Sequence, residues 1–133
     1  MVVIIPSYSS YRMSRKEVDS FIRELKEIIG DTSFNIDTDF FLNTGKEKNM
    51  QTLLDLDYSA EDVLEILSRL AVSNYSETLL DTDDQNPLFL NVFGIMIQNK
   101  EIYIKIKTRS TQKRKIICVS FHWSEHTMGY PYK

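Results

Sequence analysis

Residues 101–123 read EIYIKIKTRSTQKRKIICVSFHW, a stretch with two runs of alternating apolar and polar side chains. The first run, residues 101–109, places isoleucines on one side and a tyrosine and two lysines on the other. Side chains of a β-strand point alternately to its two faces, so this period predicts a strand with one buried face. Residues 110–114 are polar turn residues, and residues 115–123 return as a second strand. The stretch therefore predicts an antiparallel hairpin.

The position of the turn sets the register of this hairpin. If the turn is centred at residues 111–112, residues whose numbers sum to about 223 lie opposite one another. Tyr103 then faces Ser120, and Lys105 faces Cys118. We expect cross-strand neighbours of this kind to interact directly, because their Cβ atoms are close.

The two faces of the hairpin are expected to differ in character. Val119 and Phe121 should point into the core together with the isoleucines. The opposite face should display a polar and cationic set: Tyr103, Lys105, Lys107, Ser120 and His122. A rigid sheet face suits catalysis because it holds functional groups in place.

The residues before the hairpin predict helices followed by one more strand. Ser14 has the spacing of a capping box, and apolar residues then recur at helical intervals over about residues 15–29. Ser59 repeats this pattern before a helix over about residues 60–71. Residues 89–97, rich in branched and aromatic side chains, predict a strand.

Two shorter segments complete the predicted fold. Residues 47–55 predict a short helix, and residues 34–42 are a short strand or an extended arm. Helices followed by an antiparallel sheet indicate an α+β fold, here with N-terminal helices packed on the sheet. We expect one domain over residues 1–133, with an N-terminal arm (1–13) and a C-terminal tail (124–133).

Composition excludes several classes of protein. With 42% hydrophobic residues and only 4 Gly and 3 Pro among 133 residues, the chain does not resemble a disordered or collagen-like sequence. A single cysteine, Cys118, excludes an internal disulfide and a cysteine-rich zinc site, and favours a reducing compartment. The apolar start is too short for a signal peptide or a membrane span. We therefore expect a cytoplasmic location and no membrane partner.

The charge is divided unevenly along the chain. Residues 1–94 hold 8 basic and 17 acidic side chains, whereas residues 95–133 hold 8 basic and 2 acidic ones. The net charge of −3 therefore hides a basic final third, which can bind a polyanion locally. The competing interpretation is that these lysines simply solvate the outer face of a hairpin. The RNA-binding residues expected from this pattern are Lys107, Arg109, Lys113, Arg114, Lys115 and Trp123.

The polar face of the hairpin contains the groups that RNA cleavage without a metal requires. The reaction needs a base for the 2′-hydroxyl, an acid for the leaving 5′-oxygen, and cations for the phosphorane. His122 suits proton transfer near neutrality. Tyr103 can orient the hydroxyl or share the role of base, and Lys105 beside it would favour the ionised form of the phenol. The competing interpretation is a solvated sheet face, with Trp123 in the core.

Three segments resemble a known family. They are residues 53–75 (LLDLDYSAEDVLEILSRLAVSNY), 101–107 (EIYIKIK) and 117–122 (ICVSFH). In this order and spacing they resemble the MqsR family of toxin ribonucleases from bacterial toxin–antitoxin modules. The marks are the helix, the Asn/Asp-Tyr step after it, the Tyr-x-Lys strand and the Ser-Phe strand ending. The resemblance covers roughly residues 15–123.

This resemblance implies a fold similar to RelE-like microbial ribonucleases, with helices packed on a twisted antiparallel sheet. It implies a type II toxin, an mRNA interferase that acts as a metal-independent endoribonuclease. The partners would be mRNA as the substrate and a cognate antitoxin protein. We expect no cofactor and no metal.

The resemblance also assigns roles to particular residues. The functional tyrosine of the family falls on Tyr103 and its lysine on Lys105. His122 stands where a lysine often follows the Ser-Phe pair. Glu77 stands where the family often carries a lysine, and Leu90 where it often carries a glutamine. These departures leave three readings open: an acid–base pair of Glu77 and His122, an alignment shifted by one or two residues, or lost activity.

Alternative functions follow from these departures. A catalytically silent module with the same fold would use its charge asymmetry to bind a protein partner. A regulator would bind nucleic acid through the basic residues of the hairpin, with an affinity that falls steeply with salt. His126 is a second candidate for catalysis, and more typical of a surface residue.

Overall fold

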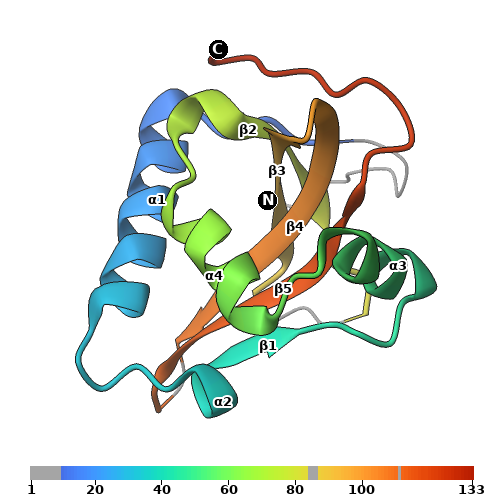
Figure 1. The fold of residues 1–133 in the computed structure, drawn as a ribbon. Coiled ribbons are helices and arrows are strands. Elements are labelled where there is room, and N and C mark those ends of the chain that lie inside the picture. The colour runs from blue at the N-terminus through green and yellow to red at the C-terminus, as the bar shows by residue number, and fades with distance from the viewer. Residues whose placement is uncertain (1–9, 84–86, 111) are drawn as a thin grey trace.

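A computed structural model describes residues 10–83, 87–110 and 112–133 (Figure 1). The helices are α1 (Arg15–Gly30), α2 (Ile36–Asp39), α3 (Glu47–Leu56) and α4 (Ala60–Ser68), with a 3₁₀ turn at Val72–Asn74. The strands are β1 (Phe40–Leu42), β2 (Tyr75–Leu80), β3 (Phe89–Ile97), β4 (Lys100–Ser110) and β5 (Arg114–Trp123). The predicted α+β class is confirmed.

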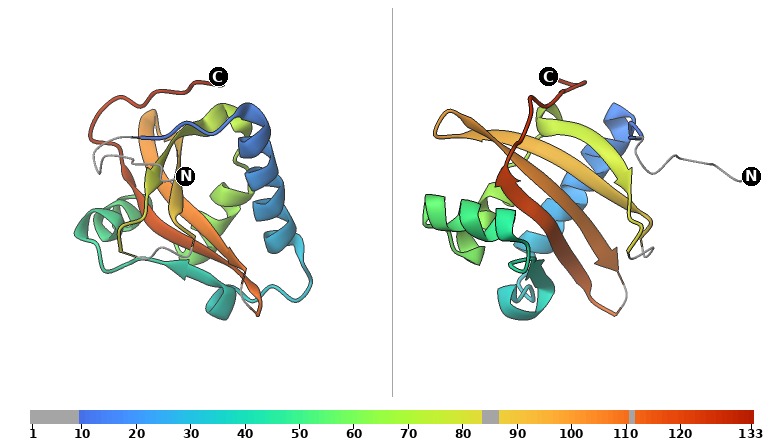
Figure 2. Two further views of the ribbon diagram at one scale, coloured as in Figure 1. Left: turned by 180° about the vertical axis from the view of Figure 1, so that it is seen from behind. Right: turned by 90° about the vertical axis from the view of Figure 1, so that its right-hand side faces the viewer.

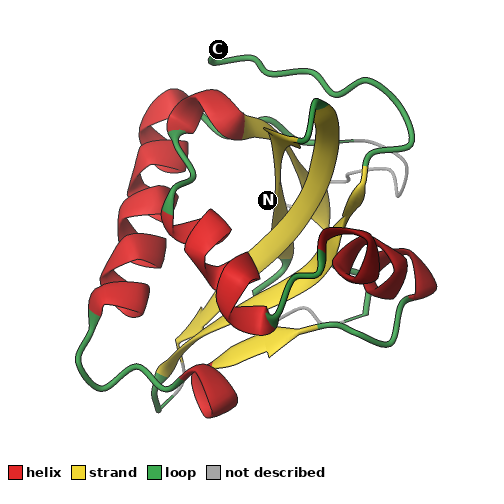
Figure 3. Cartoon of the chain, viewed as in Figure 1, coloured by secondary structure: helices red, strands yellow, loops and turns green. Residues whose placement is uncertain are grey.

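The strands form one five-stranded sheet in the order β1-β5-β4-β3-β2 (Figure 3). β2 to β5 pair antiparallel, whereas β1 pairs parallel with β5. The sheet is therefore mixed, and the expectation of a purely antiparallel sheet is wrong at this edge. Residues 34–42, left open between strand and arm, form the short helix α2 and then β1. Their pairing partner is 76 residues further along the chain at Phe40↔Ile116, where no local pattern could indicate it.

The two predicted capping boxes are present. The Ser14 hydroxyl accepts from the Glu17 N–H at 3.1 Å, and the Glu17 carboxylate accepts from the Ser14 N–H at 2.9 Å. Ser59 begins α4 in the same way. α4 ends at Ser68 rather than near residue 71, because the N–H of Arg69 bonds three residues back and tightens the last turn.

Helices α1 and α4 cover only one face of the sheet. Ile102, Ile104 and Ile106 of β4 are fully buried against them, as the alternation predicted. The right-hand view of Figure 2 shows the other face, with the strands in front of α1. We call this second surface the helix-free face. It carries the polar residues of the hairpin.

The hairpin register differs from the predicted one by two residues at its open end. Tyr103 faces His122 and Lys105 faces Ser120. A β-bulge after Lys105 places one extra residue, Val119, in β5. The sum of the residue numbers of facing pairs therefore changes along the strands. The bulge also leaves Val119 only half-buried and outside the core, whereas Phe121 is fully buried as expected.

Helix α3 closes the edge of β5 where β1 stops. The buried Asn49 side chain accepts from the Phe121 N–H at 3.0 Å and donates to the Val119 carbonyl at 3.0 Å. The Thr52 hydroxyl accepts from the Trp123 N–H at 3.1 Å. These side chains satisfy backbone groups that a neighbouring strand would otherwise pair. Side chains of α3 therefore cap the part of the β5 edge that no strand covers.

The first and last of the described residues pack on the domain. Tyr11 pairs with Thr78 of β2, while residues 1–9 of the expected arm lie outside the described residues. In the expected tail, the Tyr132 ring stacks on Tyr75 at 5.9 Å. Glu101 of β4 accepts from the Tyr130 hydroxyl at 2.8 Å. No helix among the described residues has the length and apolar character needed to cross a bilayer.

Candidate active site

A pocket of about 590 Å³ opens on the helix-free face. All four residues expected to be catalytic line it: Glu77 from β2, Tyr103 and Lys105 from β4, and His122 from β5. The remaining lining residues come from the start of α3, from β5 and from the segment after it: Lys46, Glu47, Lys48, Ser120, Ser124, Glu125 and His126. The site is therefore assembled from segments far apart in the sequence.

Glu77 reaches this pocket through β2, a strand that the sequence patterns did not predict. Residues 75–80 lack the strict alternation of β4, and a register shift between Tyr75 and Glu77 interrupts the strand. Across the sheet Glu77 faces Val92, which faces Lys105, which faces Ser120. Neighbours in such a row share one face. Leu90 is buried opposite Leu79 and does not line the pocket.

Tyr103 and His122 lie next to one another. As a directly opposed cross-strand pair, they stack with ring centroids 5.1 Å apart and an interplanar angle of 15°. The Nδ1 atom of His122 lies 2.9 Å from the Trp123 carbonyl oxygen. Since a carbonyl oxygen only accepts, this bond requires a proton on Nδ1. Nε2 is then the ring nitrogen left to exchange a proton with a substrate.

The Tyr103 phenol is held in its protonated form. Burial, followed by the nearby Glu77 carboxylate, raises the pKa of Tyr103 to about 12. The expectation that Lys105 would favour its ionised form is therefore wrong, because these two effects act in the opposite direction. Tyr103 is suited to donating a hydrogen bond at neutral pH, not to acting as a base.

Lys105 occupies a half-buried position beside a second lysine. Burial lowers the pKa of Lys105, and the neighbouring Lys46 ammonium lowers it further, while Asp81 and Asp83 oppose the change. The Lys46 ammonium donates to the buried Ser120 hydroxyl at 3.3 Å. Two ammonium groups thus flank one hydroxyl, an arrangement that favours an anion between them.

Sequence reasoning missed Lys46. It is the N-cap residue of α3, in a polar stretch with no periodicity, and it reaches β5 only because Asn49 attaches the helix there. The family resemblance implied a lysine at the position that Glu77 occupies in this chain. Lys46 places a cation in the same pocket from a different segment. The next lysine, Lys48, forms an ion pair with Glu125 at the pocket rim.

The residues expected to bind RNA do not form one surface. Lys107 lies in the same face but is buried in an ion pair with Asp81, with 2.6 Å between Nζ and Oδ2. The expected place of Lys107 on an exposed cationic surface is therefore wrong, and Asp81 is buried with it. Lys113 pairs with Asp39 at 2.5 Å and Arg114 with Glu27 at 3.3 Å.

These ion pairs join the basic final third of the chain to its acidic body. They reduce the charge separation expected from the sequence. Lys115 is exposed, and Arg109 lies opposite it across the hairpin. Trp123 belongs to the helix side: its indole N–H donates to Asp55 of α3 at 3.0 Å, so it does not face the pocket.

Among the described residues, no group of three or more His, Cys, Asp or Glu side chains is arranged to hold a metal ion. The pocket chemistry consists of protonatable side chains, with the ammonium groups of Lys46, Lys48 and Lys105 among them. Comparison with family models, with curated proteins and with solved structures returned no match to this chain.

Proposed function

We propose that this protein is a RelE-like endoribonuclease, an mRNA interferase that acts as the toxin of a type II toxin–antitoxin system in the cytoplasm. One observation carries the proposal. Glu77, Tyr103, Lys105 and His122 come from three strands, yet all line one pocket together with the additional cation Lys46. An acid, a base, a neutral donor and two cations are the groups that metal-independent RNA cleavage uses.

The proposed reaction is attack of the ribose 2′-oxygen on the adjacent phosphorus. Glu77 accepts the 2′-hydroxyl proton, and the protonated Tyr103 donates a hydrogen bond that orients the ribose. The imidazolium of His122 gives its Nε2 proton to the departing 5′-oxygen. Lys46 and Lys105 stabilise the charge on the phosphorane. The products are a 2′,3′-cyclic phosphate and a 5′-hydroxyl end.

The test is cleavage of single-stranded RNA in the presence of EDTA, with identification of the product ends. His122→Gln should reduce kcat by about 10²- to 10⁴-fold, as expected for the loss of a general acid. Glu77→Gln should have an effect in the same range. Lys16→Ala, on the exposed surface of α1, is the matched control and should leave kcat unchanged.

Two results would contradict this function, and a third would contradict only the role of His122. One is intact RNA at every protein concentration tested. Another is cleavage of an oligonucleotide whose 2′-hydroxyls are replaced by hydrogen. A third is a full loss of activity in His126→Ala with none in His122→Gln, which would transfer the acid to the other histidine of the pocket.

The pocket also bears on the alternative of a silent binding module. Such a module does not need His122 and Tyr103 stacked at 5.1 Å, or Lys46 directed at Ser120. The cognate antitoxin is expected to suppress cleavage by covering the pocket or the surface next to it. Co-expression of the cognate antitoxin should restore growth that the toxin alone arrests.

A further inference from the structure

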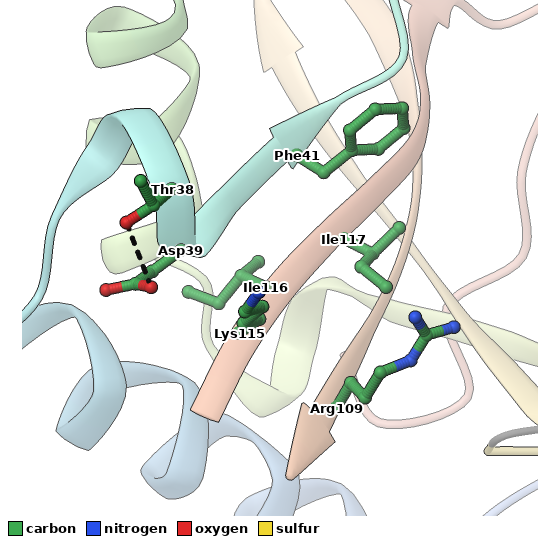
Figure 4. Close-up of a pocket in the computed structure, with 7 residues that line it drawn as sticks. All are labelled: Thr38, Asp39, Phe41, Arg109, Lys115, Ile116 and Ile117. Atoms are coloured by element: carbon green, nitrogen blue, oxygen red, sulfur yellow. Dashed lines mark hydrogen bonds between the residues drawn. The ribbon is translucent and has the colours of Figure 1, made fainter. Parts of the chain in front are cut away.

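A second cavity lies on the helix-free face, at the other end of β4 and β5. It measures about 430 Å³ and is lined by residues of α2, β1, β4 and β5: Thr38, Asp39, Phe41, Arg109, Lys115, Ile116 and Ile117 (Figure 4). None of these residues lines the pocket that contains Tyr103 and His122. The two cavities are therefore separate sites on one surface.

Phe41 gives this cavity an exposed aromatic surface. Its side chain is 60% exposed, an unusual state for a phenylalanine on a three-residue strand. Phe41 lies directly opposite Ile117 of β5, and Figure 4 shows Ile117 between Phe41 and Arg109. The surface is flat and apolar, which is what a nucleobase requires for stacking.

Two cations stand one row further along the strands. Arg109 of β4 and the exposed Lys115 of β5 are directly opposed in the hairpin, so their Cβ atoms are about 5 Å apart. Arginine and lysine side chains can both donate charge-assisted hydrogen bonds to a phosphate. Asp39 also lines the cavity, but its carboxylate is buried and paired with Lys113, which offsets its charge.

The cavity and the proposed active site lie along the same two strands, β4 and β5. Lys105 and Arg109 are four residues apart on one strand, a separation of about 13 Å along β4. Between them, the charge of Lys107 is neutralised by Asp81. Because Lys107 and Asp81 are themselves buried, an RNA strand that contacts both sites would pass beside them, along Ile117 of β5.

We propose that this cavity is a second subsite for single-stranded RNA, in which Phe41 and Ile117 stack a base while Arg109 and Lys115 bind the adjacent backbone. The inference rests on the proposed ribonuclease function and extends it to the length of substrate the enzyme engages. A peptide partner is less favoured, because the cavity combines an aromatic face with paired cations in line with the active site.

The test compares a dinucleotide with a single-stranded RNA of about ten nucleotides. In the wild type, the longer RNA should have the lower KM. Phe41→Ala should raise that KM by about 5- to 150-fold, as loss of base stacking does, and leave dinucleotide cleavage unchanged. Phe41→Trp should restore the wild-type KM.

The matched control is Leu54→Ala, which removes another exposed apolar side chain (67% exposed) that does not line this cavity. It should leave both substrates unaffected. Lys115→Ala should weaken binding of the longer RNA and reduce its salt dependence. An equal effect of Phe41→Ala on both substrates would contradict the subsite and leave the ribonuclease function intact.

Binding of a non-cleavable 2′-O-methyl decamer, measured by fluorescence anisotropy, separates the two proposals. If the wild type binds this oligonucleotide without cleaving RNA, and Phe41→Ala weakens binding, the subsite stands and the ribonuclease function fails. If the wild type cleaves RNA but does not bind this oligonucleotide, the subsite fails and the ribonuclease function stands. If Phe41→Ala leaves RNA binding unchanged but disrupts a co-purified antitoxin complex, the surface is a protein interface and the subsite is overturned.

Discussion

The two faces of β4 place residues of opposite character one position apart in the sequence. On the helix side, Ile102, Ile104 and Ile106 are fully excluded from solvent. On the helix-free face, Tyr103 and Lys105 are half-buried and line the pocket. The same backbone hydrogen bonds hold both sets. The comparison suggests that substitutions on the first face should affect stability, and those on the second should affect activity.

Lys107 is an exception to this division between the faces. Its substitution should have the largest effect on the free energy of unfolding. It lies on the helix-free face, yet its ammonium is buried against Asp81. Lys107→Met leaves a buried carboxylate without this partner and should cost about 3–5 kcal/mol of unfolding free energy. Urea denaturation measures this loss.

The exposed Lys115 on the same face provides the control for Lys107. Lys115→Met should change the unfolding free energy by less than about 0.5 kcal/mol. Adding Asp81→Asn to Lys107→Met should recover part of the loss, because the uncompensated charge is removed. Equal stability of the two single variants would show that the buried pair has no structural role.

Ile104→Ala tests the helix side, with a comparable or somewhat smaller effect. Removing three carbons from a fully buried side chain should lower the unfolding free energy by about 2–5 kcal/mol. Cleavage per folded molecule should remain at the wild-type level, because Ile104 points away from the pocket. A variant that stays stable but loses kcat would break the division between the faces.

Tyr103→Phe has the smallest expected effect on stability, and it depends on pH. Because the pKa of Tyr103 is raised from 10.0 to about 12, the unfolded state loses its proton first as pH increases. Folding stability should therefore be unaffected near pH 7 and decline between about pH 10 and about pH 12. The phenylalanine variant should show a shallower decline in denaturation series at these pH values, and parallel curves would contradict the raised pKa.

Local patterns predicted the elements whose signals are local. The capping boxes at Ser14 and Ser59 and the alternation of residues 101–109 involve side chains within a few positions of one another. Four of the pocket residues were predicted in the same way or from the family resemblance. Features set by distant contacts were missed, including the parallel pairing of β1, the bulge at Val119 and the burial of Lys107.

The errors in predicting the pocket residues also come from contacts between segments distant in the sequence. Lys46 has no distinguishing neighbour in sequence, and its position depends on Asn49 and Ser120 being folded together. Trp123 was predicted among the RNA-binding residues, but its place in the alternation of β5 puts it on the helix side, where Asp55 binds it. Consecutive residues of a strand point to opposite faces, so alternation alone separates Trp123 from His122.

The attachment of α3 to β5 determines when the pocket can exist. The bond from Lys46 to Ser120 joins residues 74 positions apart, and those from Asn49 to β5 join residues 70 and 72 positions apart. Contacts of such long sequence separation carry a large loop-closure cost and slow folding. During synthesis, a chain that has not yet released β5 from the ribosome has neither His122 nor an anchor for Lys46. The proposed active site is therefore absent from every nascent chain in which β5 has not yet left the ribosome.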